Sequence, residues 1–329
     1  MIHIDSPGLL TTVQDLGRPG HQQLGLSPGG AMDVDAARIA NLLVGNAPGA
    51  ALLEITLTGP HITFEHGRWI ALTGTDLPGT VAGARLPGWR PVWIPPGAQL
   101  VFGSVGKGCR AYLALASGID VPLVLGSRST DLRAGIGGLH GRRLIKGDRL
   151  PIDASTRPPP SPADRPCWPH WWAAHEIPTA DQRVVLRFVP GPDWSTVSDT
   201  ARQALTSGAL RVDHRFDRMG LRLSGPRLRA SNPSERLSAG VTFGTLQLPP
   251  DGQPILLGVD RQTTGGYPVL GTVARVDWSR LAQLRAGDAL CFQPISITAA
   301  QALHRARERD IARLATALSL ASHQPPIPT

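Results

Sequence analysis

Lysine is almost absent from this chain of 329 residues. Of its 33 lysines and arginines only Lys107 and Lys146 are lysine, which leaves 31 arginines, and the formal charge is +8 at pH 7. So basic a composition first suggests a nucleic-acid partner. The arginines are spread along the whole chain, however, and neither a basic run nor a series of stacking aromatics occurs. The sequence therefore predicts no nucleic-acid partner, although a basic surface could attract anionic substrates.

Cysteine is scarce and long apolar runs are missing. Cys109, Cys167 and Cys291 are far apart and have no CxxC spacing, which argues against a disulfide framework or a zinc site and indicates a reducing compartment. No run of about 18 apolar residues occurs, and an alternating pattern begins at Met1 without a signal-peptide stretch. We therefore expect no bound metal, no membrane segment and a cytoplasmic location.

Glycine and proline are plentiful instead, with 37 and 31 residues at regular intervals. This pattern is typical of short strands joined by turns. One helix stands out in the first half, because Ala36, Ala40 and Leu43 have helical spacing, Asp33 can cap its start and Gly45 can end it. The sequence thus favours a mainly β fold, a barrel or a sandwich. Strands are expected at 4–13 (with a turn at Pro7-Gly8), 52–57, 62–64, 69–72, 92–94, 100–102 and 111–115.

The length and a change in composition divide the chain. At 329 residues it is long for one core, and a stretch rich in proline and tryptophan separates two β-rich halves. Trp168, Trp171 and Trp172 in this linker either pack it onto a domain or form a partner-binding patch. Two pairs of segments have weakly similar sequence patterns, which suggests a duplicated fold. They are 96–102 with 286–292 and 70–76 with 255–260. The expected domains are 1–152 and 182–297, with the linker at 153–181 and a terminal helix and tail at 298–329.

The most polar loop of the second half runs from Gly258 to Pro268. The apolar strand 255–257 precedes it and the apolar segment 269–276 follows it. The loop carries a carboxylate, a guanidinium, an amide, two hydroxyls and a phenol, and its glycine pair Gly265-Gly266 permits close approach of a ligand. Such a loop between buried strands is where sites usually lie. Alternatively, it is a hairpin loop whose side chains satisfy only their own backbone.

Several familiar motifs fail on inspection. The stretch 25–29 matches G-x-S-x-G, but Pro28 follows Ser27 and has no N–H to serve as an oxyanion donor. The stretch 103–108 resembles a phosphate loop but has Gly108 where a magnesium-binding Ser or Thr is required. His170 and His175 are five residues apart in a proline-rich stretch, which does not make a zinc pair. Serine hydrolase, P-loop and zinc-protease functions are therefore not expected.

Six blocks, taken in their order and spacing, resemble one family. They are 11–18, 29–33, 53–56, 126–130, 217–220 and 262–268, and the resemblance extends from about residue 7 to residue 296. The chain is similar to the C subunit of bacterial 5-oxoprolinase. That family also includes the biotin-dependent carboxyltransferase region of urea amidolyase (allophanate hydrolase subunit 2-like) and an antagonist of a sporulation-kinase inhibitor.

The resemblance implies two cyclophilin-like β-barrel domains and an amidohydrolase that is active only in a complex with subunits A and B. This enzyme opens 5-oxo-L-proline to L-glutamate and uses ATP, with magnesium held by the complex. Two departures leave the substrate preference open: Arg261 replaces a common histidine, and His214-Arg215-Phe216 replaces small serine-rich residues. Biotin carboxylase and biotin-carrier segments are absent, so we do not expect a complete urea amidolyase.

Opening a lactam with ATP requires a base, positive charge near the phosphoryl group and groups that orient the ring. Glu235 or Asp260 is the candidate base, and Arg218 could hold a carboxylate or phosphate. Alternatively, Arg218 pairs only with Asp217 and Glu235 caps a loop. In the first half, Gln14, Asp15, Arg18 and Glu54 are interpreted as scaffolding. The candidate substrate-binding residues are Gln247, Gln262, Thr263, Thr264, Gly265, Gly266 and Tyr267.

Two other functions stay open. One is a biotin-dependent carboxyltransferase that acts on a small amide of the urea or allophanate kind. The other is a non-catalytic regulator that binds a partner resembling the B component of 5-oxoprolinase, through the basic face or the 168–172 tryptophan cluster. The enzyme hypothesis predicts that Asp260→Ala abolishes activity and leaves the fold intact.

Overall fold

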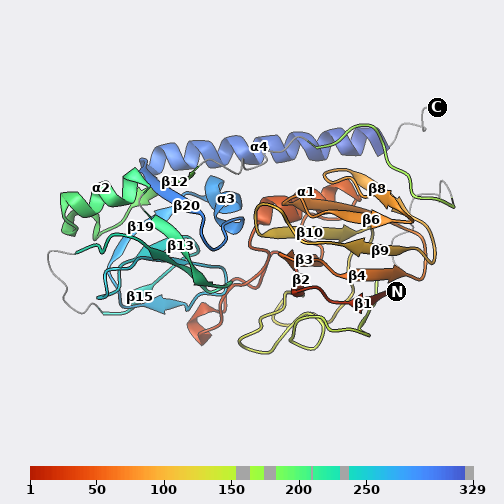
Figure 1. Ribbon diagram of the computed structural model, residues 1–329, viewed down its shortest axis with the longest axis horizontal. Helices are drawn as coiled ribbons and strands as arrows, with labels where there is room; N and C mark the ends of the chain where they lie inside the picture. Colours follow the sequence, from red (N-terminus) through yellow and green to blue (C-terminus); the bar gives the residue numbers. More distant parts are fainter. Residues whose placement is uncertain (153–163, 174–182, 209, 230–236, 323–329) are drawn as a thin grey trace. The chain divides into compact units, whose positions relative to one another are not determined.

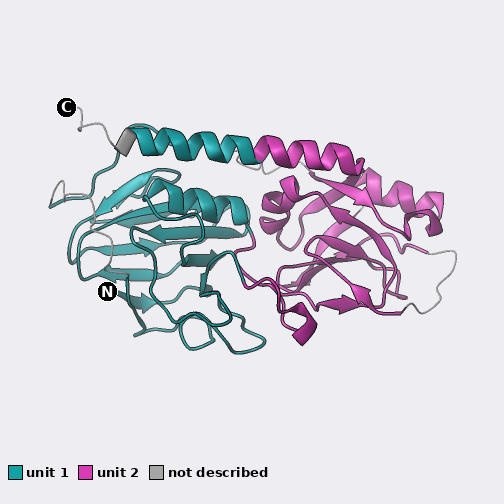
Figure 2. Cartoon of the chain, turned by 180° about the vertical axis from the view of Figure 1, so that it is seen from behind, with its two compact units in different colours: residues 1–17, 33–177, 308–329 teal, residues 18–32, 178–307 magenta. Residues whose placement is uncertain are grey.

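The computed structural model describes residues 1–152, 164–173, 183–208, 210–229 and 237–322 (Figure 1). Its residues divide into two compact units (Figure 2). Unit 1 comprises 1–17, 33–177 and 308–329, and unit 2 comprises 18–32 and 178–307. The chain therefore passes from one unit to the other four times, and the short segment 18–32 is part of unit 2 although the sequence on both sides of it belongs to unit 1.

The strands of unit 1 form two antiparallel sheets. One sheet has the order β11-β1-β4-β9-β6-β7 and the other has the order β2-β3-β10-β5-β8. The expected turn at Pro7-Gly8 separates the first two strands. The bounds are β1 (Ile2–Ser6), β2 (Leu10–Gln14), β3 (Leu52–Thr56), β4 (His61–Phe64), β5 (Arg68–Gly74), β6 (Gly79–Val81), β7 (Ala84–Arg85), β8 (Pro91–Ile94), β9 (Gln99–Phe102), β10 (Arg110–Leu115) and β11 (Arg149–Leu150).

The core of unit 1 contains alternate side chains of both sheets. Ile62 and Phe64 of β4 are buried together with Leu53 and Ile55 of β3, because the side chains of a strand alternate between its two faces. Helix α1 (Val34–Leu43) packs on β5 and β10 (Figure 1). The Asp33 carboxylate accepts a hydrogen bond from the Ala36 N–H at 3.1 Å, so the predicted N-cap is confirmed.

The last helix and part of the linker also pack on unit 1. Helix α4 (Ile297–Ser322) carries Leu314 and Leu318, which contact a small core that includes Ile39 of α1. The Arg38 guanidinium donates to both Glu308 oxygens at 2.7 and 2.8 Å. In the linker, Trp168 packs against the main core of unit 1, whereas Trp171 and Trp172 are exposed. The tryptophan cluster therefore combines one packing residue with two surface residues.

Unit 2 is built around a closed barrel with the strand order β12-β19-β16-β17-β14-β13-β20. Its one parallel pair, β12 with β20, joins strands distant in sequence. The interior is apolar, with Phe188, Leu246, Leu256 and Phe292 buried, and Met32 joins the same core from segment 18–32. The strand bounds are β12 (Val184–Pro190), β13 (Leu210–Phe216), β14 (Gly220–Ser224), β15 (Ala239–Gly240), β16 (Thr245–Gln247), β17 (Ile255–Leu257), β18 (Thr264–Gly265), β19 (Val269–Val273) and β20 (Ala289–Pro294).

The helices of unit 2 are short. Helix α2 (Asp199–Ser207) is capped by the Ser198 hydroxyl, which accepts from the Ala201 N–H at 3.2 Å. Helix α3 (Trp278–Ala282) follows a 3-10 turn, η3 (Arg275–Asp277). Two further 3-10 turns are η1 (Gln22–Leu24) and η2 (Trp194–Thr196).

The mainly β prediction is confirmed, with a few helices and a long helix near the C-terminus. Unit 2 is a closed barrel, and the strands of unit 1 are arranged as two sheets. Helices α2 and α3 were not expected from the sequence. Within the described residues no helix is long and apolar enough to cross a membrane, and no group of three or more His, Cys, Asp or Glu side chains could hold a metal.

Candidate functional site

The polar loop 258–268 leaves strand β17 in close contact with the turn before β14. The Gly258 N–H donates to the Met219 carbonyl at 2.7 Å, and the Asp260 N–H donates to the Arg218 carbonyl at 2.9 Å. A Cβ at Gly258 would lie only 2.1 Å from the Arg218 carbonyl oxygen. Only glycine fits at this approach of two backbones, and the loop therefore starts from a fixed position.

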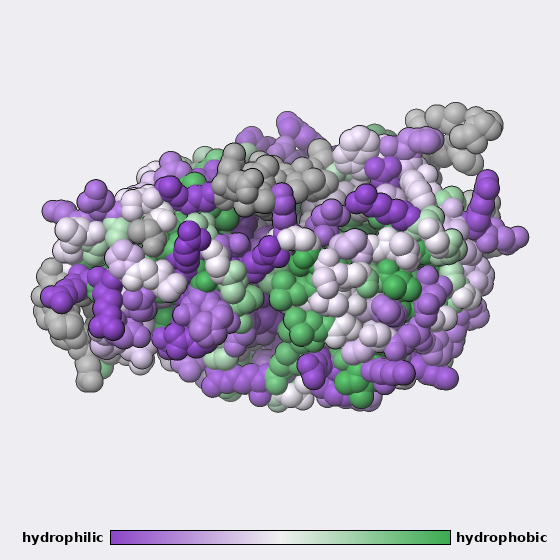
Figure 3. All heavy atoms as spheres, viewed as in Figure 1, coloured by the Kyte–Doolittle hydropathy of each residue, from purple (hydrophilic) through white to green (hydrophobic). Residues whose placement is uncertain are grey.

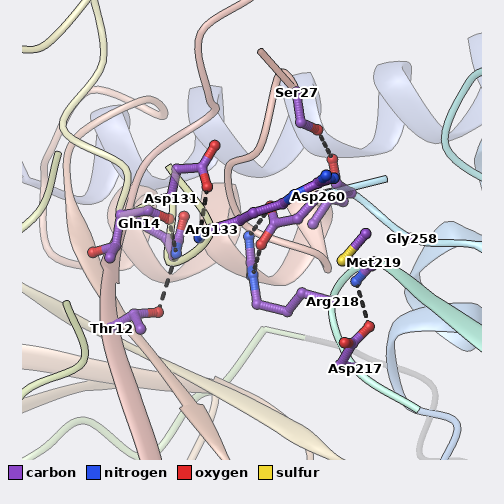
Figure 4. A network of polar contacts seen from close by, with 12 residues as sticks. Thr12, Gln14, Ser27, Asp131, Arg133, Asp217, Arg218, Met219, Gly258 and Asp260 are labelled. Carbon is purple, nitrogen blue, oxygen red and sulfur yellow. Dashed lines mark hydrogen bonds and ion pairs between the residues drawn. The ribbon is translucent and has the colours of Figure 1, made fainter. Parts of the chain in front are cut away.

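Asp260 and Arg218 form a buried ion pair at the base of this loop (Figure 4). The guanidinium Nε lies 2.8 Å from Oδ2 and its second nitrogen lies 3.1 Å from Oδ1. The same guanidinium nitrogen donates to the Gly30 carbonyl at 2.6 Å. Since bidentate pairing fixes orientation as well as charge, Arg218 ties the loop to segment 18–32. Asp260 is thus placed as the partner that orients Arg218.

Segment 18–32 contributes backbone and one hydroxyl to the same place. Gly29 and Gly30 have φ of 60° and 89°, a left-handed backbone that brings the Gly30 carbonyl to Arg218. The Ser27 hydroxyl is buried and donates to the Val259 carbonyl at 2.5 Å (Figure 4). Ser27 is therefore a structural hydrogen-bond donor, which agrees with the exclusion of the G-x-S-x-G motif as a nucleophile.

Arg261 connects the loop to the backbone directly after strand β15. Its buried guanidinium donates to the Val241 carbonyl at 3.1 Å and to the carbonyls of Gly258 and Val259 at 3.5 and 3.4 Å. Burial lowers the pKa of Arg261, and the neighbouring Asp260 carboxylate acts in the opposite direction. The residue that departs from the family pattern is thus a donor to backbone carbonyls.

Beyond Arg261 the loop turns outward. The side chains of Gln262, Thr264 and Tyr267 are exposed, whereas Thr263, Gly265 and Gly266 are partly buried. Strand β18 of the loop pairs with β15, and the Val241 N–H donates to the Thr263 carbonyl at 3.1 Å. An amide, a hydroxyl and a phenol are therefore presented to solvent on a fixed backbone, and these groups can orient a polar ligand by hydrogen bonding.

Gln247, a predicted substrate-binding residue, and Asp217, the alternative partner expected for Arg218, have structural roles. Gln247 is buried, and its amide donates to the Tyr267 carbonyl at 3.4 Å, so it supports the loop from behind. Asp217 accepts from the N–H groups of Met219 and Gly220 at 2.7 and 3.2 Å and closes its own turn. Arg218 therefore pairs with Asp260 rather than with Asp217. Glu235 lies outside the described residues.

Asp15 and Glu54, two of the four first-half residues predicted as scaffolding, make structural contacts within unit 1. Asp15 accepts from the hydroxyls of Ser127 and Ser129 at 2.6 and 2.5 Å and from the Arg128 N–H at 2.6 Å. Glu54 accepts from the Tyr112 hydroxyl at 2.8 Å within the sheet. Burial, reinforced by the charge of Glu54, raises the pKa of Tyr112 well above its ordinary value. These groups fix loops and strands, and local sequence gave no signal for the Tyr112 contact.

The chain belongs to the carboxyltransferase family defined by "Carboxyltransferase domain, subdomain A and B", whose family model matches residues 24–294. Its curated relatives include the 5-oxoprolinase C subunit of Escherichia coli (strain K12), which is 40% identical over 316 residues, or 96% of this chain and 98% of that protein. The protein of the same name in Haemophilus influenzae (strain ATCC 51907 / DSM 11121 / KW20 / Rd) is 33% identical over 90% of this chain and 92% of its own length.

Solved structures show the same fold. The crystal structure of the K. lactis urea amidolyase matches 95% of this chain with a TM-score of 0.86 and 30% identity. The match covers 20% of that much longer chain. The resemblance inferred from six sequence blocks is therefore confirmed at the level of the family.

Proposed function

We propose that this chain is the C subunit of an ATP-dependent 5-oxoprolinase, which opens 5-oxo-L-proline to L-glutamate in the cytoplasm together with subunits A and B. The observation that carries the proposal is the 40% identity to the E. coli protein of that name, over 98% of its length. An identity spread over the whole of both chains supports a common role better than a shared domain within a longer protein does.

The loop 258–268 supports this role as a surface that orients a small polar ring. 5-Oxoproline carries a lactam and a carboxylate, so it offers hydrogen-bond donors and acceptors on a compact ring. The exposed Gln262 amide, Thr264 hydroxyl and Tyr267 phenol are groups of matching chemistry on a fixed backbone. Thr263, Gly265 and Gly266 are proposed to contribute backbone groups next to them.

Arg218 and Asp260 are proposed to act together. Because the guanidinium engages both carboxylate oxygens and the Gly30 carbonyl, the pair holds the loop and segment 18–32 in one arrangement. This geometry supports a positioning role for Asp260 rather than that of a free base. Glu235 remains the proposed base, and its test is a loss of turnover in Glu235→Gln.

Neither a P-loop in the sequence nor a metal-binding cluster among the described residues is available to hold ATP with magnesium. In segment 103–108, Gly108 follows Lys107 at the position where a Ser or Thr would hold the metal. No group of three or more metal-binding side chains is found among the residues with assigned positions. We therefore propose that nucleotide and magnesium are held by the other subunits, and we assign no step on this chain to them.

The test is release of glutamate from 5-oxoproline with ATP, first with this chain alone and then with subunits A and B. We expect activity only in the mixture. The variants Gln262→Ala, Thr264→Val and Tyr267→Phe change exposed groups, so they should fold normally and raise KM or lower kcat by about 10-fold or more. A mixture that assembles and releases no glutamate would refute the proposal.

A second candidate is a biotin-dependent carboxyltransferase on a small amide. The family's carboxyltransferase description and the match to urea amidolyase favour it. This function requires a carboxylated biotin, whereas 5-oxoprolinase does not. Glutamate release that persists when avidin is present to sequester biotin would therefore exclude the second candidate. If the chain is a non-catalytic regulator instead, substitution of Gln262, Thr264 and Tyr267 should leave glutamate release by the assembled mixture unchanged.

A further inference from the structure

The loops that follow β10 display large apolar side chains to solvent. Leu123, Leu125, Leu132 and Ile145, here called the apolar loop surface, are between 41% and 59% exposed. Figure 3, in the same view as Figure 1, shows hydrophobic side chains gathered over these loops, which Figure 1 draws in yellow-green. Isolated exposed leucines are ordinary, but several on one set of loops mark an interaction surface.

The backbone beneath these side chains is fixed by internal hydrogen bonds. Asp15 accepts from Ser127, Arg128 and Ser129, and the Asp131 carboxylate accepts from the N–H groups of Arg133 and Ala134 at 3.0 and 2.9 Å. A loop that is already ordered loses little conformational entropy on binding. The leucines are therefore presented in a preorganised arrangement.

The same loops cover the outer edge of strand β2. The Thr130 N–H donates to the Val13 carbonyl at 2.9 Å, and the Leu144 N–H donates to the Thr11 carbonyl at 2.9 Å. The edge of β2 is thus already hydrogen-bonded to these loops, and the apolar side chains lie on the outer side of the loops. Burial of Leu123 or Ile145 in turn requires another molecule.

Apart from Asp120, which is exposed and accepts from the Arg128 guanidinium at 2.9 Å, the exposed charges on these loops are positive. Asp131 and Asp148, the acidic residues within 121–149, are buried, and Asp148 accepts from the Arg142 guanidinium at 2.7 and 2.8 Å. The exposed charged side chains of this stretch are Arg133, Arg143, Lys146 and Arg149. Basic side chains on the same loops as exposed apolar ones match an acidic surface that carries apolar residues.

We propose that the apolar loop surface binds an acidic face of another protein subunit. The inference rests on the proposed function, since it takes that subunit to be one of the two other components of the 5-oxoprolinase. Leucine and isoleucine offer no flat face on which bases could stack, which favours a protein over a nucleic acid. Ordered loops that hold leucines at separate positions can also complement the irregular surface of a folded protein.

The test is the affinity of this full-length chain for each of the other subunits, measured by biolayer interferometry at 50 and 300 mM salt. The double variant Leu123→Asp/Leu132→Asp should weaken binding by at least about 30-fold. Arg133→Glu/Lys146→Glu should weaken it at low salt and flatten its salt dependence. Leu237→Asp, at a 95% exposed leucine of unit 2, is the matched control and should bind as the wild type does.

Three outcomes would overturn the proposal. They are absence of binding to both subunits, unchanged affinity of the double variant, and tighter binding of the wild type to phosphatidylglycerol vesicles than to either subunit. Circular dichroism and thermal unfolding establish that each variant is folded. A complex that forms, depends on Leu123 and Leu132 and yet releases no glutamate from 5-oxoproline would refute the proposed function and leave the docking surface standing.

Discussion

Asp260 lies in a buried ion pair, and this changes what its removal should do. From sequence alone, Asp260→Ala was expected to abolish activity without affecting the fold. The bidentate pair with Arg218 predicts that the substitution leaves a buried guanidinium without its carboxylate and costs about 3–5 kcal/mol of stability. The measurement is urea unfolding of wild type and variant.

The double variant Asp260→Ala/Arg218→Met is the control for this prediction. Because it removes both charges, it should recover a large part of the lost stability. If Asp260→Ala unfolds at the same urea concentration as the wild type, the pair contributes little and the carboxylate is free for another role.

At position 258 the close approach of two backbone segments requires glycine. A Cβ there would overlap the Arg218 carbonyl oxygen, so Gly258→Ala must push apart the loop and the turn before β14. We expect a loss of about 1–3 kcal/mol in unfolding free energy, measured by thermal or urea unfolding. Gly240→Ala is the matched control, because a Cβ at Gly240 meets no atom within 4 Å. Equal effects of the two substitutions would contradict the close approach.

Sequence reasoning identified the individual groups of this site but not how they pair. Polarity between two apolar strands located loop 258–268, and the glycines indicated a close approach. The ion-pair partner of Arg218 could not be predicted from the sequence, because Asp260 is 42 residues away and the adjacent Asp217 was equally plausible. Ser27 and Gly30 lie far from the loop in sequence and join it only through long-range folding.

At the scale of elements, local patterns predicted the strands and the long helices well. Alternation predicted β1 to β5, and capping residues placed both ends of α1. Helix α2 was missed because only Ala201 and Leu205 of its nine residues are buried, which leaves too short an apolar stripe to read. Helix α3 has five residues and is shorter than the periodicity can detect.

Besides the Arg38–Glu308 ion pair, helix α4 packs on unit 1 through a narrow apolar stripe. Ile311, Leu314 and Leu318 follow helical spacing; the first is 4% exposed and the other two pack on the core around Ile39. Ile311→Ala should cost about 2–5 kcal/mol, measured by chemical unfolding. Leu320→Ala, on the exposed side of the helix, should change stability by less than about 0.5 kcal/mol. Similar losses in both variants would mean that the stripe does not anchor the helix.

The turn before β11 depends on an ionised Asp148. The hydrogen bonds from Arg142 lower the pKa of Asp148 below its ordinary value, against the opposing effect of burial. Its contribution to stability is therefore present above the unfolded-state pKa of about 3.9 and is lost as the pH falls through the lower folded-state pKa.

Asp148→Asn tests this pH dependence. The wild type should be more stable than the variant at pH 6, and the difference in unfolding free energy should shrink as the pH falls below about 4. Urea unfolding at several pH values measures it. A difference that is constant between pH 6 and pH 2.5 would show that the charge of Asp148 is not the cause.

At the scale of the whole molecule, the path of the chain is what the sequence revealed least. The change in composition after residue 152 suggested two consecutive halves. In the structure, unit 2 also includes residues 18–32. Helix α4 is divided between the units, with its residues up to 307 in unit 2 and those from 308 onward in unit 1. Nothing in the local composition of 18–32 distinguishes it from its neighbours, because its membership depends on single contacts such as Ser27 with Val259 and Arg218 with Gly30.

Met32 allows this path to be tested. It is fully buried in the apolar core of unit 2, although the helix that directly follows it in the chain belongs to unit 1. Met32→Ala should therefore destabilise the barrel by about 2–5 kcal/mol. Hydrogen exchange should speed up at the amides of β16 and β17 and remain unchanged at those of β3 and β10. Leu24→Ala, at an exposed position of the same segment, should change neither set. Faster exchange in β3 and β10 alone would instead place Met32 in the core of unit 1.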